Sequence, residues 1–334
     1  MKSLQTPFPR LPRQLGMTLI ELMIAMTIGL VILGAVSTLF INVRQSFSTA
    51  ENMSRIQENA RYAVEMLARD IRMAGYLGCG NLESISVNTI ANAPIEELLF
   101  DNVLRGQDSP AGQIAGITLV RADSITIKRG IGSDVHLVGN LVPSNANIKI
   151  NSNPDNFVAG DVLMVTNCTN ADVFRATNVS SGGTITIAHS NSSNTGNRIG
   201  TYGEDAFLMR LAQFVFFIGV NPAGRPALYR ANTVMGAGAA VAVEIADSVE
   251  NMEIQYGVDT NGDDSPDEYQ TATAITGTND WDSVVSVKLR LLVVSPDPNV
   301  LSAAQSHTFN GTTVSDRRMR QVFTTTIAIR NRLP

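Results

Sequence analysis

The sequence predicts an α+β fold, in which a long N-terminal helix packs on an antiparallel β-sheet and a β-rich subdomain is inserted between the two. Apolar residues recur at steps of three and four from Met53 to Ala74, which is typical of an amphipathic helix. Beyond Tyr76 the period changes to two, in short runs separated by Gly, Asn, Ser and Asp, which is typical of strands. The 334 residues and 44% apolar content are sufficient for such a core.

The segment 17–41 is apolar and contains one ionisable residue, Glu21. A helix of that length spans roughly 37 Å at ~1.5 Å per residue, more than the ~30 Å of a bilayer's hydrocarbon core. Lys2, Arg10 and Arg13 precede it, and positive charge marks the cytoplasmic side. We therefore expect a single membrane pass, with all later residues on the far side.

Glu21 is the unusual residue of this segment, because a carboxylate at membrane depth costs roughly 2.5–3.5 kcal/mol. It either lies near enough the interface to be hydrated or has a cationic partner. No A-x-A cleavage site follows the apolar run, so we expect the helix to remain on the protein.

The helix is predicted to continue without a break to Ala74, with Gly75 and Gly78 as stop signals. Together with the membrane segment it forms the predicted region 17–76. Its second half has a charged face that we expect to be exposed. That face comprises Arg55, Glu58, Arg61, Glu65, Arg69, Asp70 and Arg72.

Strands are predicted in two groups. The first lies in the β-rich region 77–203 and includes 125–127, 148–150, 162–165 and 185–187. The second lies in region 204–334 and is expected to form one antiparallel sheet with a wet face. Its members are 208–220, 252–258, 285–293 and 323–329.

The string Gly16-Met17-Thr18-Leu19-Ile20-Glu21 resembles the prepilin signature of type IV pilins and type II secretion pseudopilins. The resemblance implies that a prepilin peptidase removes the leader 1–16 after Gly16 and that Met17 becomes the N-methylated first residue. The family's commonest first residue is Phe, so Met17 is a departure. The freed amine of Met17 would then give Glu21 a cationic partner, in its own chain or in a neighbouring subunit during assembly.

The helix end, Arg69 to Cys79, and the terminal stretch 322–334 resemble PilW-type minor pilins. That resemblance implies a subunit that primes type IV pilus assembly at or near the fibre tip. The implied partners are other minor pilins and the major pilin, contacted through the helix, and an adhesin-like protein at the tip. The implied location is the inner membrane, with the remainder in the periplasm before assembly and in an extracellular pilus afterwards.

Cys79 and Cys168 are the two cysteines, and we expect them to form a disulfide in a compartment that permits one. Two free buried thiols are the alternative.

The segment 259–268 is strongly acidic and alternates oxygen-bearing side chains, as a calcium loop does. The candidate ligands are Asp259, Asn261, Asp263, Ser265 and Asp267. Two positions depart from an EF-hand-like loop, since Asp264 replaces the sixth-position Gly and Gln270 the twelfth-position Glu. A solvated acidic turn is the alternative, and calcium is the one cofactor that the sequence suggests.

Catalysis and nucleic-acid binding are not expected. The formal charge is −5 without a long basic run, and no hydrolase, metalloprotease, P-loop or dinucleotide motif is present. His136, His189 and His307 are expected to be satisfied surface or core residues, and Trp281 a core aromatic. Two alternatives to the pilus subunit remain, a type II secretion pseudopilin and a membrane-anchored calcium-dependent adhesin.

Overall fold

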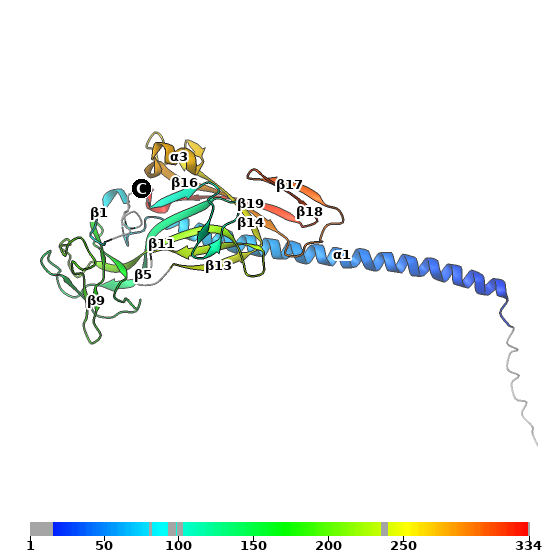
Figure 1. Ribbon diagram of the computed structural model, residues 1–334, viewed down its shortest axis with the longest axis horizontal. Helices are drawn as coiled ribbons and strands as arrows, with labels where there is room; N and C mark the ends of the chain where they lie inside the picture. Colours follow the sequence, from blue (N-terminus) through cyan, green and yellow to red (C-terminus); the bar gives the residue numbers. More distant parts are fainter. Residues whose placement is uncertain (1–15, 80–81, 93–97, 99–102, 235–239, 333–334) are drawn as a thin grey trace, which may run out of the picture. The chain divides into compact units, whose positions relative to one another are not determined.

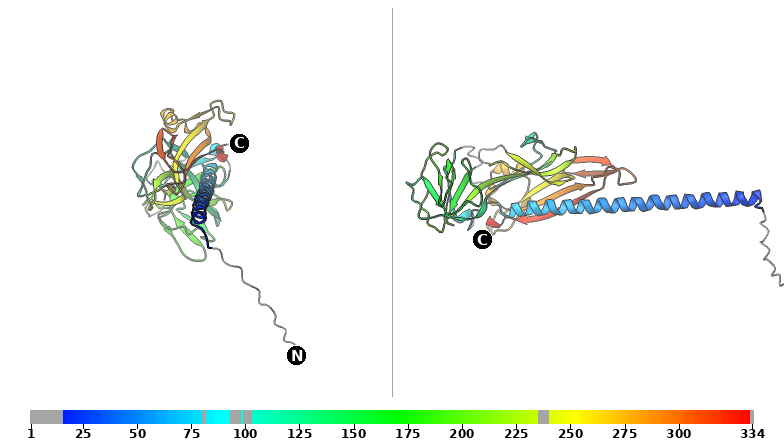
Figure 2. Two further views of the ribbon diagram at one scale, coloured as in Figure 1. Left: turned by 90° about the vertical axis from the view of Figure 1, so that its right-hand side faces the viewer. Right: turned by 90° about the horizontal axis from the view of Figure 1, so that it is seen from below.

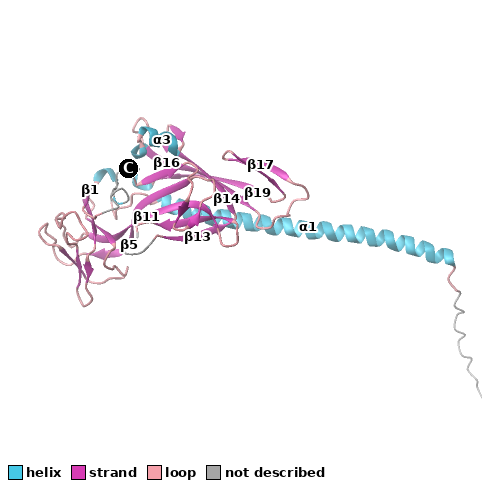
Figure 3. Cartoon of the chain, in the orientation of Figure 1, coloured by secondary structure: helices cyan, strands magenta, loops and turns pink. Residues whose placement is uncertain are grey.

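The computed structural model describes residues 16–79, 82–92, 98, 103–234 and 240–332. The chain forms two compact units, Met1–Glu51 and Asn52–Pro334. Of the predicted leader 1–16, only Gly16 lies among the described residues. The fold is α+β as predicted, with one long N-terminal helix and a β-rich remainder (Figure 3).

Helix α1 spans Leu19–Arg72, 54 residues that continue from the first unit into the second. Its end lies two residues before the predicted Ala74. Gly75 stops it with φ of +73°, a left-handed conformation that favours glycine. The Gly75 N–H donates to the carbonyl of Lys128, 2.8 Å away, so the chain leaves the helix beside a strand.

Strands form most of the second unit (Figure 1). Before residue 203 they are β1 (Ser86–Thr89), β2 (Leu104–Gln107), β3 (Gln113–Ile114), β4 (Ile117–Thr118), β5 (Ser124–His136), β6 (Asn147–Ile150), β7 (Val162–Thr166), β8 (Asn170–Arg175), β9 (Asn178–Val179) and β10 (Ile185–Ala188). After it they are β11 (Phe207–Val220), β12 (Pro226–Asn232), β13 (Val241–Asp247), β14 (Val249–Val258), β15 (Glu268–Gln270), β16 (Val284–Val294), β17 (Gln305–Phe309), β18 (Thr312–Asp316) and β19 (Arg320–Ala328). The short helical segments are η1 (Leu82–Ser84), α3 (Ala272–Thr278), η2 (Trp281–Ser283) and η3 (Arg330–Arg332).

An eight-stranded sheet has the order β1-β8-β7-β11-β12-β13, with β5 on the other side of β11 and β2 beside β5. The prediction that 208–220 shares a sheet with the later strands is therefore wrong, because β11 pairs with β5, β7 and β12. Strand β11 is buried on both faces over most of its length, and alternation alone cannot assign such a strand to one sheet. The domain boundary at 203/204 stays a prediction.

The later strands form an antiparallel four-stranded sheet in the order β15-β14-β16-β19. Smaller sheets are β6-β10-β9 and the hairpins β3-β4 and β17-β18.

The main core joins α1 to both large sheets. Ile56, Leu67 and Ile71 of α1 are fully buried in one cluster with side chains of β11, β14 and β16. Within α1 the buried positions recur at steps of three and four, so one helical face supplies this part of the core. Figure 2 shows the C-terminal η3 beside the end of α1, and Asn331 Nδ2 donates to the carbonyl of Ala74 at 3.0 Å.

Asp123 connects the two large sheets. Its carboxylate accepts from the N–H of Ile254 in β14 at 2.9 Å, and its own N–H donates to the carbonyl of Met252 at 2.9 Å. Asn310, at the tip of the β17-β18 hairpin, donates to the same carboxylate at 3.3 Å. Burial raises the pKa of Asp123, and these donors act in the opposite direction. One carboxylate thus fixes β5, β14 and the hairpin together.

Candidate functional site

The start of α1 is a capping box formed by Thr18 and Glu21. The Glu21 carboxylate accepts from the N–H and the hydroxyl of Thr18, each at 3.0 Å, and the Thr18 hydroxyl accepts from the Glu21 N–H at 3.4 Å. This role was not predicted from the sequence, although the T-x-x-E spacing before an apolar run is its signal. Gly16 is exposed, and a Cβ on it would meet nothing within 4 Å. The peptide bond after Gly16 is therefore sterically open.

The helix that follows is long and apolar enough to cross a membrane. Its large side chains point outward throughout the first unit; Leu30, Val31 and Phe40, for example, are 69%, 73% and 67% exposed. An exposed surface with so many large apolar side chains requires lipid or another protein around it.

At the other end of α1, Asp70 is buried and paired with two arginines. Its Oδ1 accepts from Arg129 Nη2 of β5 at 2.8 Å, and its Oδ2 lies 3.2 Å from Arg230 Nη1 of β12. Both guanidinium groups lie over the ring of Phe214, at 5.2 and 4.7 Å from its centre. The expectation that Asp70 faces solvent is wrong, because the sheet supplies two cations for it.

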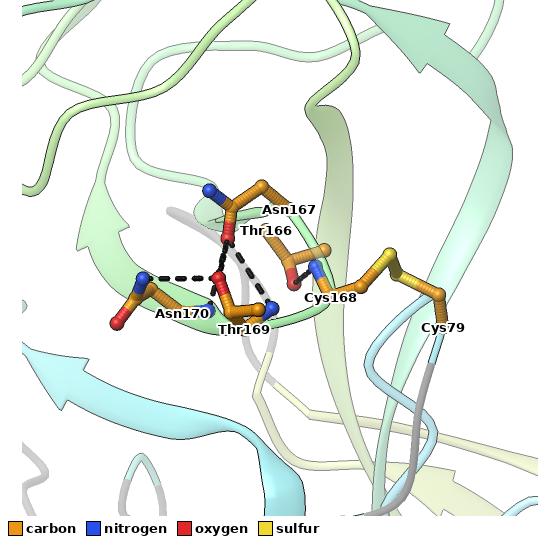
Figure 4. Close-up of a disulfide and its surroundings, with 6 residues drawn as sticks. All are labelled: Cys79, Thr166, Asn167, Cys168, Thr169 and Asn170. Carbon is orange, nitrogen blue, oxygen red and sulfur yellow. Dashed lines mark hydrogen bonds between the residues drawn. A yellow bond between two sulfur atoms is a disulfide. The ribbon is translucent and has the colours of Figure 1, made fainter.

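The structure joins Cys79 and Cys168 by a disulfide (Figure 4). Cys168 lies in the turn between β7 and β8, where it has φ of +70°. The side chain of Asn167 orders this turn by accepting from the N–H groups of Thr169 and Asn170, at 3.3 and 2.9 Å. The bond attaches the segment after α1 to the β7-β8 hairpin.

The acidic segment 259–267 forms the connection between β14 and β15. Its carboxylates accept from the loop's own backbone. Asp259 accepts from the N–H groups of Gly262 and Asp264, each at 2.7 Å, and Asp263 from that of Ser265 at 3.0 Å. Asp267 accepts from the N–H and hydroxyl of Thr260.

These bonds change the acidity of two of the loop's carboxyl groups. Hydrogen bonds from the Thr260 side chain and backbone lower the pKa of Asp267. At Asp259 burial raises the pKa, but the backbone donors together outweigh it and the net pKa is lowered. Among the described residues, no group of three or more His, Cys, Asp or Glu is placed to hold a metal ion. Calcium binding stays a prediction.

Two further residues that the sequence pointed to, Trp281 and His189, lie in the core. Trp281 is 1% exposed and packs edge-on against Tyr256, with ring centres 5.0 Å apart, so the core prediction is confirmed. His189 is fully buried, and neither ring nitrogen has a hydrogen-bond partner in the described part of the chain. The expectation of a satisfied histidine is therefore wrong for His189.

The long N-terminal helix follows an exposed glycine, has an apolar first half and carries the β-rich remainder on its second half. This is the arrangement expected of a pilin-like subunit. Residues 11–37 match the prokaryotic N-terminal methylation motif, and residues 215–331 match the family of the type IV pilus-assembly protein W, PilW. The two matches confirm the resemblance predicted from the sequence, which is to the PilW-type minor pilins of type IV pili. No curated protein and no solved structure matches the chain.

Proposed function

We propose that this protein is a minor pilin that initiates and supports type IV pilus assembly at the fibre tip. Its partners are other minor pilins, the major pilin and an adhesin-like tip protein. The observation that carries the proposal is the methylation motif at residues 11–37, at the start of an exposed apolar helix. Before assembly the helix anchors the chain in the inner membrane and residues after it lie in the periplasm.

Glu21 has two roles in this proposal. Before processing, its carboxylate caps α1 through Thr18. After cleavage behind Gly16, the new amine of Met17 lies one residue from Thr18, so it can pair with Glu21 of its own chain or of a neighbour. Such a pair compensates the carboxylate within the apolar filament core.

The second unit supplies partner contacts in this scheme, and 77–203 acts as an inserted β-rich subdomain. We propose no catalytic role, in agreement with the structural character of pilin families. The family match over 215–331 supports the pilus over a secretion pseudopilin.

Processing is tested first. N-terminal mass measurement of the wild type should show a chain that begins at Met17 and carries an N-methyl group. Gly16→Val should leave the precursor uncut in the inner membrane, because a side chain at this position blocks the peptidase. Retention of residues 1–16 in the wild type rejects the proposal.

The assembly role of Glu21 is tested with Glu21→Gln, which retains an acceptor for the Thr18 N–H but removes the charge. We expect normal membrane insertion and impaired piliation. Thr18→Val is the matched control, since it weakens the cap and keeps the charge, and it should assemble. Normal piliation by Glu21→Gln contradicts the charge-pairing role.

Position is tested by cross-linking mass spectrometry on sheared fibres. Links to other minor pilins at one fibre end support the tip role. Links distributed along the shaft, or only to secretion-system proteins, reject it.

A further inference from the structure

A cavity of about 490 Å³ lies where the end of α1 meets β5 and the start of β11. Met73, Ile131 and Met209 supply apolar wall, while Arg69 and Arg129 supply guanidinium groups. Asp134 is the one acidic residue among those that line it, and its side chain is 74% exposed beside His136. The wall of the cavity thus combines apolar side chains with polar groups, and two of its polar groups are cationic.

The charges around this cavity do not balance. One buried carboxylate, Asp70, serves two arginines, Arg129 and Arg230, whose side chains are only 12% and 28% exposed. A partly buried excess positive charge is costly unless an anion compensates it. Arg69 adds an exposed cation with no ion-pair partner among the described residues. The excess remains even when Asp134 is counted.

An unused donor lies at the same place. Arg129 lines the cavity and donates a hydrogen bond from Nη2 to Asp70. Its Nε, however, is buried without a hydrogen-bond partner in the part of the chain that the structure describes. Buried donors in native proteins are nearly always paired. An anion bound against this guanidinium group would compensate the charge excess.

We propose that the cavity is a binding site for a carboxylate carried by an apolar peptide segment. The carboxylate lies against Arg69 and Arg129, and the apolar side chain next to it contacts Met73 and Met209. The chemistry fits either a peptide C-terminus that ends in an apolar residue or a Glu or Asp side chain within an apolar stretch. The site does not depend on the proposed role in pilus assembly.

The test uses the full chain in detergent micelles with ¹³C-methyl-labelled methionines. Two probes separate the sources of the carboxylate: N-acetyl-leucine presents a terminal carboxylate, and N-acetyl-glutamyl-leucinamide a side-chain carboxylate. At least one should shift the methyl signals of Met73 and Met209 saturably, while the signal of the remote core residue Met252 stays unchanged. N-acetyl-leucinamide, which lacks the carboxylate, should bind about tenfold more weakly.

A matched pair of variants tests the charge. Arg69→Gln should weaken binding by about tenfold, because it removes a charge-assisted contact. Arg72→Gln removes another exposed arginine at the same helix end, one that does not line the cavity, and it should leave binding unchanged. Three results each overturn the proposal: no saturable shift with either probe, equal binding of the amide, or equal weakening by the two variants.

Discussion

Asp70 of α1 and Arg129 of β5 form an ion pair across the helix–sheet interface, with Oδ1 and Nη2 2.8 Å apart and side chains 1% and 12% exposed. Arg230 of β12 approaches the second carboxylate oxygen at 3.2 Å. The last turn of α1 is therefore attached to two different strands of the eight-stranded sheet. Because these side chains are buried, losing one of them lowers stability more than at an exposed ion pair. The charges that remain then have no counter-ion.

We predict that Asp70→Ala lowers the free energy of unfolding by about 3 kcal/mol, since it leaves two partly buried arginines without their carboxylate. Urea unfolding of the full chain in detergent measures the change. Glu65→Ala is the matched control on the exposed face of α1, and we expect it within about 0.5 kcal/mol of wild type. Equal effects of the two variants would contradict the role of Asp70.

The position of Asp70 also shows what helical periodicity can predict and what it cannot. The pattern from Met53 to Ala74 predicted the helix and its apolar face, and Ile56, Leu67 and Ile71 are buried accordingly. The same pattern placed Asp70 on the charged, exposed face. Periodicity cannot show which side chains of a distant strand will lie next to the helix. The partners Arg129 and Arg230 are 59 and 160 residues away along the chain.

We predict that the double variant Cys79→Ser with Cys168→Ser loses about 3–4 kcal/mol of unfolding free energy. The disulfide closes a loop between residues 89 positions apart. Closing a loop of this length lowers the conformational entropy of the unfolded chain and so favours the folded state. Urea unfolding with and without reductant measures the effect: reductant should destabilise the wild type and leave the variant unchanged. Two alkylatable thiols in exported wild-type protein would reject the bond.

We predict that the free energy of unfolding falls on acidification because of His189. Burial lowers its pKa in the folded state from the ordinary 6.5, partly offset by nearby polar backbone groups and by the Asp172 charge. Below pH 6.5 the unfolded chain therefore binds a proton at His189 more readily than the folded chain does. The free energy of unfolding is at its full value above pH 6.5 and falls as the pH drops below it. The limiting slope is about 1.4 kcal/mol per pH unit.

The measurement is urea unfolding of the full chain at pH 7.5 and 5.5. His189→Leu removes the titrating ring and should reduce the difference between the two pH values. His136→Gln is the control, because His136 is 43% exposed, and it should retain the wild-type difference. An unaltered difference in His189→Leu would show that another group is responsible.

The sequence predicted the strands better than their partners. The runs at 125–127, 148–150, 162–165 and 185–187 all lie within strands of the structure. Sheet membership was missed at β11 because both of its faces are buried by different sets of neighbours. The Arg69–Arg129 cavity could not be predicted either, since it depends on how β5 and the end of α1 meet.

The acidic loop gives the last prediction, that calcium stabilises the protein. Asp264 occupies the position of the sixth-residue glycine in an EF-hand-like loop and adopts φ of +63°, so its backbone has the conformation that glycine supplies there. The departure at this position therefore does not prevent the loop from forming. The missing twelfth-position Glu still weakens the site, and a dissociation constant near ~1 mM is typical of weak extracellular sites.

At 10 mM calcium such a site adds about 1.4 kcal/mol of stability by mass action, or roughly 3 °C in melting temperature. The full chain should therefore melt higher in calcium than in chelator. Asp263→Ala should abolish the difference, because the Asp263 carboxylate accepts one hydrogen bond within the turn, from the Ser265 N–H, and is otherwise available to a cation. Glu268→Ala removes a neighbouring charge outside the predicted ligand set and should preserve the difference. Identical melting curves of the wild type in calcium and in chelator would mean that the backbone hydrogen bonds of Asp259 and Asp267 are what hold this turn.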